Sequence, residues 1–193
     1  LSTLLSPLST LLSPLSTLHS ILPPPKHKYN LLEGVCMAIL NIIKEGDPIL
    51  RKTSRPIEKV DERTKQLAQD MLETMRAANG AGLAGVQVGK LRRIVVVETE
   101  PDKPYIMINP VIIASEGRQT EVEGCLSIPG KWGITDRPMT VTVRATGLDG
   151  KEYTVTGSGL TARAFCHELD HLDGKLYTDN VIRMLDPDEI EEG

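Results

Sequence analysis

Aromatic residues and cysteines are scarce in this chain of 193 residues. One Trp, one Phe and four Tyr make up 3% of the sequence, so Leu, Ile, Val and Met must fill most of the core. The three cysteines, Cys36, Cys125 and Cys166, are too few and too scattered for the disulfide framework of a secreted domain. A reducing compartment is therefore expected.

An excess of positive charge and a long apolar run are also missing. The formal net charge is −4, which gives no electrostatic footprint for DNA or RNA. At the N-terminus, Pro and Ser interrupt any apolar run of membrane-spanning length, and the basic start of a secretory signal is absent. We expect neither DNA nor a membrane as a partner.

The first 36 residues differ from the rest in composition. LSTLLSP, LSTLLSP and LSTLHSI repeat with a period of seven, but proline in the first two repeats argues against a continuous coiled coil. PPPKHKYN (23–30) is typical of an extended linker. We expect residues 1–36 to be a low-complexity leader, disordered or not native, and residues 37–193 to form a single domain that starts near Met37. A plastid-type transit segment is the weaker alternative for the leader.

Apolar side chains recur with helical spacing in two segments, at about 61–79 and at 160–172. In the first, Asp61 is expected to cap the start and Gly80 to end the helix. In the second, Phe165, Leu169 and Leu172 share a face that should pack into the core.

Strand-like segments lie between these helices and before them. They are bounded by Gly, Pro and Asp and cover residues 38–43, 94–97, 105–108, 111–114, 139–145 and 153–156. Strands between two helices without regular alternation indicate an α+β fold with mainly antiparallel sheets.

The second predicted helix carries HELDH at residues 167–171. Because residues four apart lie on one face of a helix, His167 and His171 can direct their imidazoles at one divalent cation. Glu168 is poorly placed as a third ligand and is therefore free to move protons. Taken alone, the motif also fits exposed helix charges with a hydrogen-bonded histidine.

A catalytic metal needs a third protein ligand and one position open to water. No histidine follows His171, and the acidic C-terminal DPDEIEEG is more simply a solvated end. Cys125 in EGCLSIPG is the better candidate, since it follows a strand-like stretch and Gly124. By residue type alone, an ordinary buried cysteine remains the alternative.

Three motifs occur in a definite order: GAGLAGVQ (80–87), EGCLS (123–127) and HELDH (167–171). Together they resemble the signature motifs of peptide deformylases, and the resemblance covers the chain from Met37 onward, including GDPILR and NPVI. It implies an α+β fold, with mainly antiparallel β-sheets packed around a central metal-binding helix. The implied activity is metal-dependent hydrolysis of the N-formyl group from the formyl-methionine that begins a new polypeptide, releasing formate.

The resemblance also assigns the catalytic roles. The metal ligands would be Cys125, His167 and His171. Glu168 would act as general base and then as general acid, and the oxyanion would be stabilised by the Gln87 amide and the Leu126 backbone N–H. Without the motif, Gln87 would be read as a surface side chain. Two imidazoles and a thiolate suit Fe²⁺, Co²⁺, Ni²⁺ or Zn²⁺, and the resemblance favours Fe²⁺ in the cell with Zn²⁺ as a replacement.

Substrate and supporting residues follow from the same resemblance. Gly80 and Gly82 would let a peptide lie against the main chain as an added strand. The methionine pocket would be lined by Ala81, Ile128, Leu160, Ala164 and His167. Glu123 and Arg137 resemble an ion pair that holds the Cys125 loop, with two unrelated surface charges as the alternative, and Asp170 is expected to hydrogen-bond a ligand histidine or local backbone.

The partners implied are N-formylmethionyl peptides of nascent chains, met in transient proximity to the ribosome. Trp132 and Arg163 depart from the family pattern, where arginine and an apolar residue are common. A bacterial cytoplasmic location is expected, with an organellar stroma or matrix as the alternative. Two other functions stay open from the residues: an HExxH metallopeptidase and a structural zinc protein without catalysis.

Overall fold

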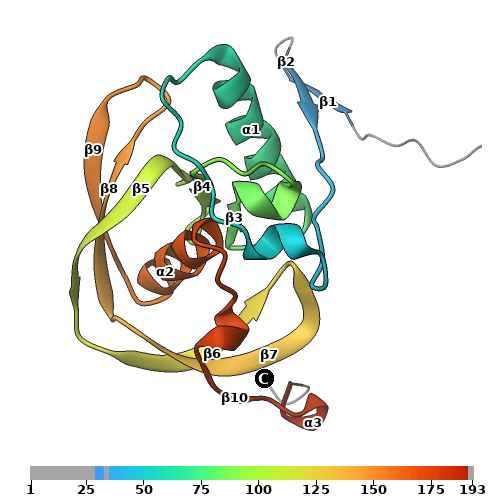
Figure 1. Ribbon diagram of the computed structural model, residues 1–193, viewed down its shortest axis with the longest axis vertical. Coiled ribbons are helices and arrows are strands. Elements are labelled where there is room, and N and C mark those ends of the chain that lie inside the picture. Colours follow the sequence, from blue (N-terminus) through green and yellow to red (C-terminus); the bar gives the residue numbers. More distant parts are fainter. Residues whose placement is uncertain (1–28, 33–34, 191–193) are drawn as a thin grey trace, which may run out of the picture.

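The computed structural model describes residues 29–32 and 35–190 (Figure 1). Most of the predicted leader therefore lies outside the described residues. Tyr29–Leu32 (β1) and Val35–Ala38 (β2) pair as an antiparallel hairpin. The end of the predicted linker thus lies in β1, and the expected domain start at Met37 falls inside β2.

The predicted strand at 38–43 is wrong. β2 ends at Ala38, and the backbone after it runs along helix α1 (Glu62–Ala77) without regular structure. There the Leu40 N–H donates to Thr74 Oγ1 at 2.8 Å, and the Ile43 N–H donates to the Gln87 carbonyl at 2.8 Å. Hydrogen bonds to the Thr74 side chain and to the Gln87 backbone therefore replace the ladder of a strand in this apolar run.

Two antiparallel sheets form the body of the domain. The five-stranded sheet has the order β3 (Gly82–Ala84), β4 (Ile94–Val97), β5 (Tyr105–Glu116), β8 (Thr140–Thr146) and β9 (Glu152–Ser158). The three-stranded sheet has the order β10 (Val181–Met184), β7 (Ile128–Arg137) and β6 (Gln119–Cys125). All of these named strand pairs are antiparallel, which confirms the expected fold class.

The strand predictions were right in four places and incomplete in others. β4 has the predicted bounds, and β8 and β9 cover the predicted segments with small shifts. The segments 105–108 and 111–114 belong to one strand, because Asn109 and Pro110 form a bulge in β5 and not a turn. β6 was expected only as a strand-like stretch before Cys125, without bounds, and β7 was not predicted, since its first half is mostly exposed and shows no apolar alternation.

Helix α1 (Glu62–Ala77) begins where its cap predicts. The Asp61 carboxylate accepts a hydrogen bond from the Thr64 N–H at 2.8 Å, and Met71 and Met75 are buried against the sheet. The expected stop at Gly80 is corrected: Asn79 takes the left-handed backbone conformation, with φ 53°. Gly80 instead gives room to Leu126, whose Cδ1 would lie 2.6 Å from a Cβ at that position.

Helix α2 (Leu160–Leu172) has the predicted bounds and lies near the centre of the molecule, beside strands of both sheets (Figure 1). Phe165, Leu169 and Leu172 pack in one core cluster with residues of the five-stranded sheet, as expected. Short helices η1 (Pro48–Arg51), η2 (Gly85–Val88), η3 (Tyr177–Asp179) and α3 (Pro187–Ile190) complete the described elements. None of the described helices combines the length and apolar character needed to span a bilayer.

Candidate active site

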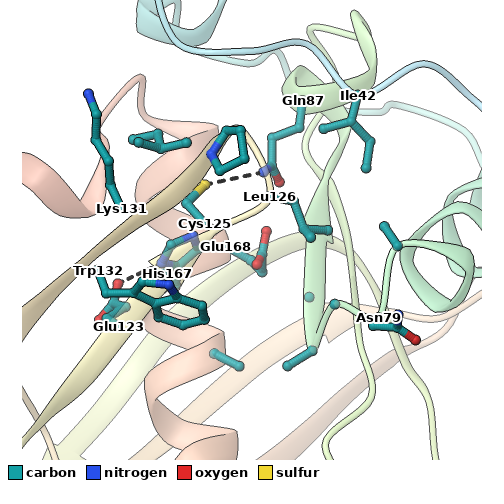
Figure 2. Close-up of a pocket in the computed structure, with 18 of the residues that line it drawn as sticks. Ile42, Asn79, Gln87, Glu123, Cys125, Leu126, Lys131, Trp132, His167 and Glu168 are labelled. Carbon is teal, nitrogen blue, oxygen red and sulfur yellow. Dashed lines mark hydrogen bonds and ion pairs between the residues drawn. The ribbon is translucent and has the colours of Figure 1, made fainter. Parts of the chain in front are cut away.

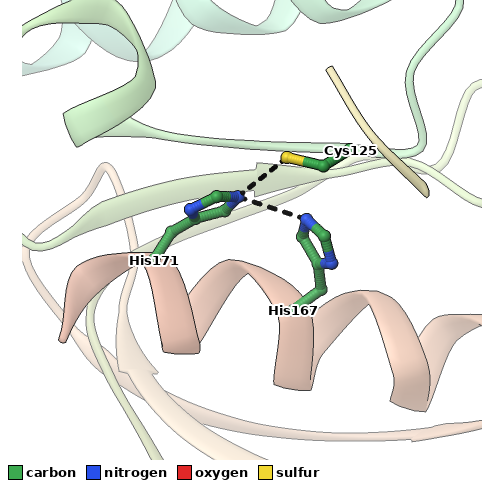
Figure 3. Close-up of side chains that lie close together, drawn as sticks. All are labelled: Cys125, His167 and His171. Atoms are coloured by element: carbon green, nitrogen blue, oxygen red, sulfur yellow. Dashed lines mark hydrogen bonds between the residues drawn. The ribbon is translucent and has the colours of Figure 1, made fainter. Parts of the chain in front are cut away.

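Three side chains with metal-binding atoms converge between β6 and α2 (Figure 3). Cys125 ends β6 at an irregularity in the β6–β7 pairing, and the two histidines lie one turn apart on α2. The His171 Nε2 lies 3.3 Å from the Cys125 Sγ and 3.2 Å from the His167 Nε2, and all three atoms lie within 4.8 Å of one another. The structure therefore brings together the three predicted ligands.

The orientation of the imidazoles suits a bound cation. His167 Nδ1 lies 2.6 Å from Glu123 Oε1, so the ring donates there and turns its Nε2 toward Cys125. Burial lowers the pKa of His171 well below its ordinary value, which favours the neutral imidazole that binds metal. Burial alone would also lower the pKa of His167, but hydrogen bonds with Cys125 and Glu123 raise it, so a cation must displace a proton there. The donor set fits a divalent transition-metal ion.

A buried ion pair supports the ligand His167. Glu123 and Arg137 are only 5% and 7% exposed, which rules out two unrelated surface charges. Arg137 donates to both carboxylate oxygens of Glu123, at 2.8 and 3.1 Å, and Thr135 Oγ1 donates to the second at 2.7 Å. Burial would raise the pKa of Glu123, but the hydrogen bonds from His167 and Arg137 hold it well below the usual range.

Asp170 is placed differently from the expectation. Its Oδ2 accepts a hydrogen bond from Arg137 Nη1 at 2.6 Å, and no described side-chain bond joins it to a ligand histidine. The prediction of a direct bond to histidine is therefore corrected: Asp170 holds the guanidinium that in turn holds Glu123.

Glu168 lies beside the proposed ligands in a buried position at the cavity wall. It is 3% exposed, and its Oε2 has no hydrogen-bond partner in the structure. Burial raises the pKa of Glu168 to about 7, a value suited to both accepting and donating a proton near neutrality. A Cβ at Gly82 would lie 2.3 Å from Glu168 Oε1 and 2.8 Å from its Cγ, so a side chain at this position would displace the carboxylate.

Gln87 points its amide at the Cys125 loop (Figure 2). It is 1% exposed, so the surface alternative is excluded. Its Oε1 accepts the Ala84 N–H at 2.8 Å, which fixes the amide so that Nε2 donates to Ser127 Oγ at 3.1 Å and approaches Cys125 Sγ at 3.6 Å. Leu126, the residue between Cys125 and Ser127, lines a cavity together with Gln87.

The cavity beside these groups has a volume of about 610 Å³. It reaches from His167, Glu168 and Cys125 to a rim where Trp132 and Leu160 are 41% and 49% exposed. All of the predicted substrate residues line it: Gly80, Ala81, Gly82, Ile128, Leu160 and Ala164. Its wall therefore carries an apolar surface next to the candidate metal centre, as a site for an apolar side chain requires.

Comparison with known proteins agrees with this geometry. The sequence model of the family described as "Polypeptide deformylase" matches residues 39–186. The peptide deformylase of Acetivibrio thermocellus is 52% identical over 155 residues, which cover 80% of this chain and 91% of that protein. The peptide deformylase of Finegoldia magna is 53% identical over 157 residues, covering 80% of this chain and 96% of that protein. The chain belongs to the peptide deformylase family.

Solved structures of this family have the same fold. The crystal structure of the Thermotoga maritima peptide deformylase superposes with a TM-score of 0.72 at 35% identity, over 74% of this chain and 97% of that one. The structure from Legionella pneumophila also gives a TM-score of 0.72, at 38% identity, over 80% of this chain and 90% of that one. These matches confirm the family and the hydrolase activity that the three motifs predicted. They favour neither the metallopeptidase nor the structural zinc protein.

Sequence reasoning missed several residues around this deformylase site. Ser127 is fully buried, and its N–H donates to Cys125 Sγ at 3.4 Å; its place within EGCLS was the available signal. Thr135 lies two residues before Arg137 on β7, so strand alternation places both on one face. Lys44 donates to the Leu126 carbonyl across 82 residues of sequence, for which no local pattern gives a signal.

Proposed function

We propose that this chain removes the formyl group from the N-terminal formyl-methionine of nascent polypeptides, with Glu168 as the proton carrier. The metal ion would be held by Cys125, His167 and His171. The observation that carries this proposal is the convergence of a thiol and two imidazole nitrogens within 4.8 Å beside a buried carboxylate oxygen that lacks a hydrogen-bond partner. When bound, the cation supplies a Lewis acid that polarises the formyl carbonyl and lowers the pKa of water. Fe²⁺ is the proposed native ion, with Zn²⁺, Ni²⁺ or Co²⁺ as replacements.

Glu168 serves both proton transfers of the reaction. Its carboxylate accepts a proton from the attacking water as the water oxygen bonds to the formyl carbon. It then delivers that proton to the nitrogen as the C–N bond breaks, giving formate and a free amine. Because burial brings the pKa of Glu168 to about 7, the same group is a competent base and a competent acid.

The negative charge that develops on the formyl oxygen is met by donors of the chain. The Gln87 amide is fixed by the Ala84 N–H, and the Leu126 N–H follows the ligand Cys125 directly. Donors held in place before the reaction need no reorganisation as charge develops, and losing one typically lowers kcat by about 10² to 10³.

The peptide itself is bound between two sheet edges. β3 ends the five-stranded sheet and β6 ends the three-stranded sheet, and residues of both strands line the cavity. A substrate backbone can pair with such an edge while its methionine side chain enters the apolar pocket at Ile128 and Ala164. Gly80 and Gly82 keep side chains out of the path of that backbone.

The experiment is an anaerobic assay of iron-loaded protein on formyl-Met-Ala-Ser, with unformylated Met-Ala-Ser as the control substrate. Glu168→Ala should abolish formate release while keeping the metal, whereas the exposed Glu121→Ala should retain activity. Cleavage of internal peptide bonds would support the metallopeptidase instead. Metal retention by wild type with neither activity would support a structural zinc protein.

The setting of the reaction follows from its substrate. Formyl-methionine is present at the start of newly made chains, so we propose transient proximity to the ribosome. A bacterial cytoplasm is the proposed compartment, with an organellar stroma or matrix as the alternative. The acidic residues near the described C-terminus, Asp186, Asp188 and Glu189, do not suit stable docking on RNA.

A further inference from the structure

Three consecutive residues before η1 each donate a hydrogen bond to a backbone carbonyl close to the proposed oxyanion donors. The carbonyls are those of Gln87, Leu126 and Ser127. The linking segment, Ile43–Glu45, lies between β2 and η1 and has no regular secondary structure. The Ile43 N–H donates to the Gln87 carbonyl at 2.8 Å, and the Glu45 N–H donates to the Ser127 carbonyl at 2.7 Å. Between them, Lys44 Nζ donates to the Leu126 carbonyl at 2.7 Å.

These bonds join parts of the site that the sheets do not join. Gln87 lies in η2, directly after β3 of the five-stranded sheet, while Leu126 lies between β6 and β7 of the three-stranded sheet. The two proposed oxyanion donors therefore approach from different sheets. Their spacing depends on links between these two parts of the chain: the Gln87 amide contacts Ser127 Oγ at 3.1 Å and Cys125 Sγ at 3.6 Å, and the linking segment bonds to both parts.

We propose that Lys44 is a positioning residue for the oxyanion site. Its ammonium group holds the peptide plane that follows Leu126, and the Glu45 N–H holds the next plane, after Ser127. With Cys125 fixed as a metal ligand at the other end, the Leu126 N–H is held between two anchored points. This inference rests on the proposed function, because it assigns the Leu126 N–H to the reaction.

The positive charge of Lys44 suits its hydrogen bond to the Leu126 carbonyl for holding this part of the chain in place. A hydrogen bond with one charged partner is stronger than a neutral one. Lys44 is exposed, so solvent weakens this bond in the free protein, and a peptide that fills the cavity lined by Lys44 would strengthen it by displacing water. The ion pair between Lys131 Nζ and Glu45 Oε2, at 2.9 Å, ties the linking segment to β7 as well.

The test compares Lys44→Met with Lys44→Arg. Methionine keeps an unbranched apolar stem but cannot donate, whereas arginine keeps a donating cation. For Lys44→Met we expect kcat on formyl-Met-Ala-Ser to fall about tenfold, since a displaced donor loses part of its effect. KM, metal content and melting temperature should stay near wild type, and Lys44→Arg should recover most of kcat. Lys151→Met, at an exposed turn, is the matched control.

Each of the following outcomes would contradict the positioning role of Lys44. Wild-type kcat in Lys44→Met would mean that this hydrogen bond is dispensable. A rise in KM alone would mean that Lys44 contacts the peptide directly. A fall in kcat that follows loss of metal or of folding, or that Lys44→Arg does not reverse, would mean a general structural role. If the wild-type protein, assayed in parallel, releases no formate from formyl-Met-Ala-Ser, it is the proposed function that fails.

Discussion

At the scale of single residues, the site depends on a chain of contacts behind the metal ligands. Glu123 holds His167, Arg137 holds Glu123, and Asp170 holds Arg137. Glu123, Arg137 and His167 are buried, and Asp170 is partly exposed. The geometry of the His167 ring is therefore set by charged side chains that are not among the proposed metal ligands.

Replacing Glu123 with Gln tests this support. The change removes one of the two carboxylates that hold the buried Arg137, leaving Asp170, and weakens the bond that orients His167. We expect metal affinity to fall about 10- to 100-fold, and the free energy of unfolding to fall by about 3 kcal/mol, the order of cost for breaking a buried pair. Competition with a chromophoric chelator and urea denaturation measure the two effects. Glu121→Gln is the control on the same strand, with a side chain 61% exposed; equal effects of both changes would refute the support.

At the scale of secondary-structure elements, β5 contains a bulge at Asn109 and Pro110 that bends the strand. Asn109 takes a left-handed backbone conformation, with φ 51°, and the pairing with β8 shifts register after it. Its side-chain oxygen accepts the Ile57 N–H and its amide donates to the Ile57 carbonyl, both at 2.8 Å. The bulge therefore fastens the loop before α1 to the sheet as well as bending the strand.

Asn109→Ala should destabilise the fold without changing the chemistry. Alanine loses both bonds to Ile57 and tolerates the left-handed conformation poorly, so we expect the free energy of unfolding to fall by about 1 to 3 kcal/mol. Asn109→Gly should be intermediate, because glycine relieves only the backbone strain. Urea denaturation measures the loss, and kcat should not change because Asn109 does not line the cavity. A stability equal to that of Asn41→Ala, an exposed control, would contradict this role.

At the scale of the whole molecule, the features predicted correctly are those that apolar periodicity or the order of the motifs indicates. α2 and β4 have the predicted bounds because their apolar patterns are continuous. Cys125 was assigned to the histidines by motif order, since no local pattern links the end of a strand to a later helix. The bond from Lys44 to Leu126 and that from Arg137 to Asp170 span 82 and 33 residues. Such contacts depend on how the two sheets meet, which a local pattern does not specify.

The same arrangement would make a cation held by the three proposed ligands a link between the sheets. Cys125 belongs to the three-stranded sheet, while His167 and His171 lie on the helix that packs against the five-stranded one. Because a cation bound to the folded state stabilises that state, removing it should lower stability as well as activity. At an ion concentration about 100 times the dissociation constant, the contribution is about 2.7 kcal/mol.

Chelation should therefore lower the melting temperature by about 5 to 10 °C, given roughly 2–4 °C per kcal/mol for a chain of this size. Scanning fluorimetry with and without chelator measures the shift, and added Zn²⁺ should reverse it. Cys125→Ala should lack the chelator-dependent shift because it removes one of the three ligands. Cys166→Ala should keep it: Cys166 is buried on the same helix, and burial raises its thiol pKa to about 11, but it is not among the converging ligands. An equal shift in the Cys125 and Cys166 variants would show that the cation does not join the sheets through Cys125.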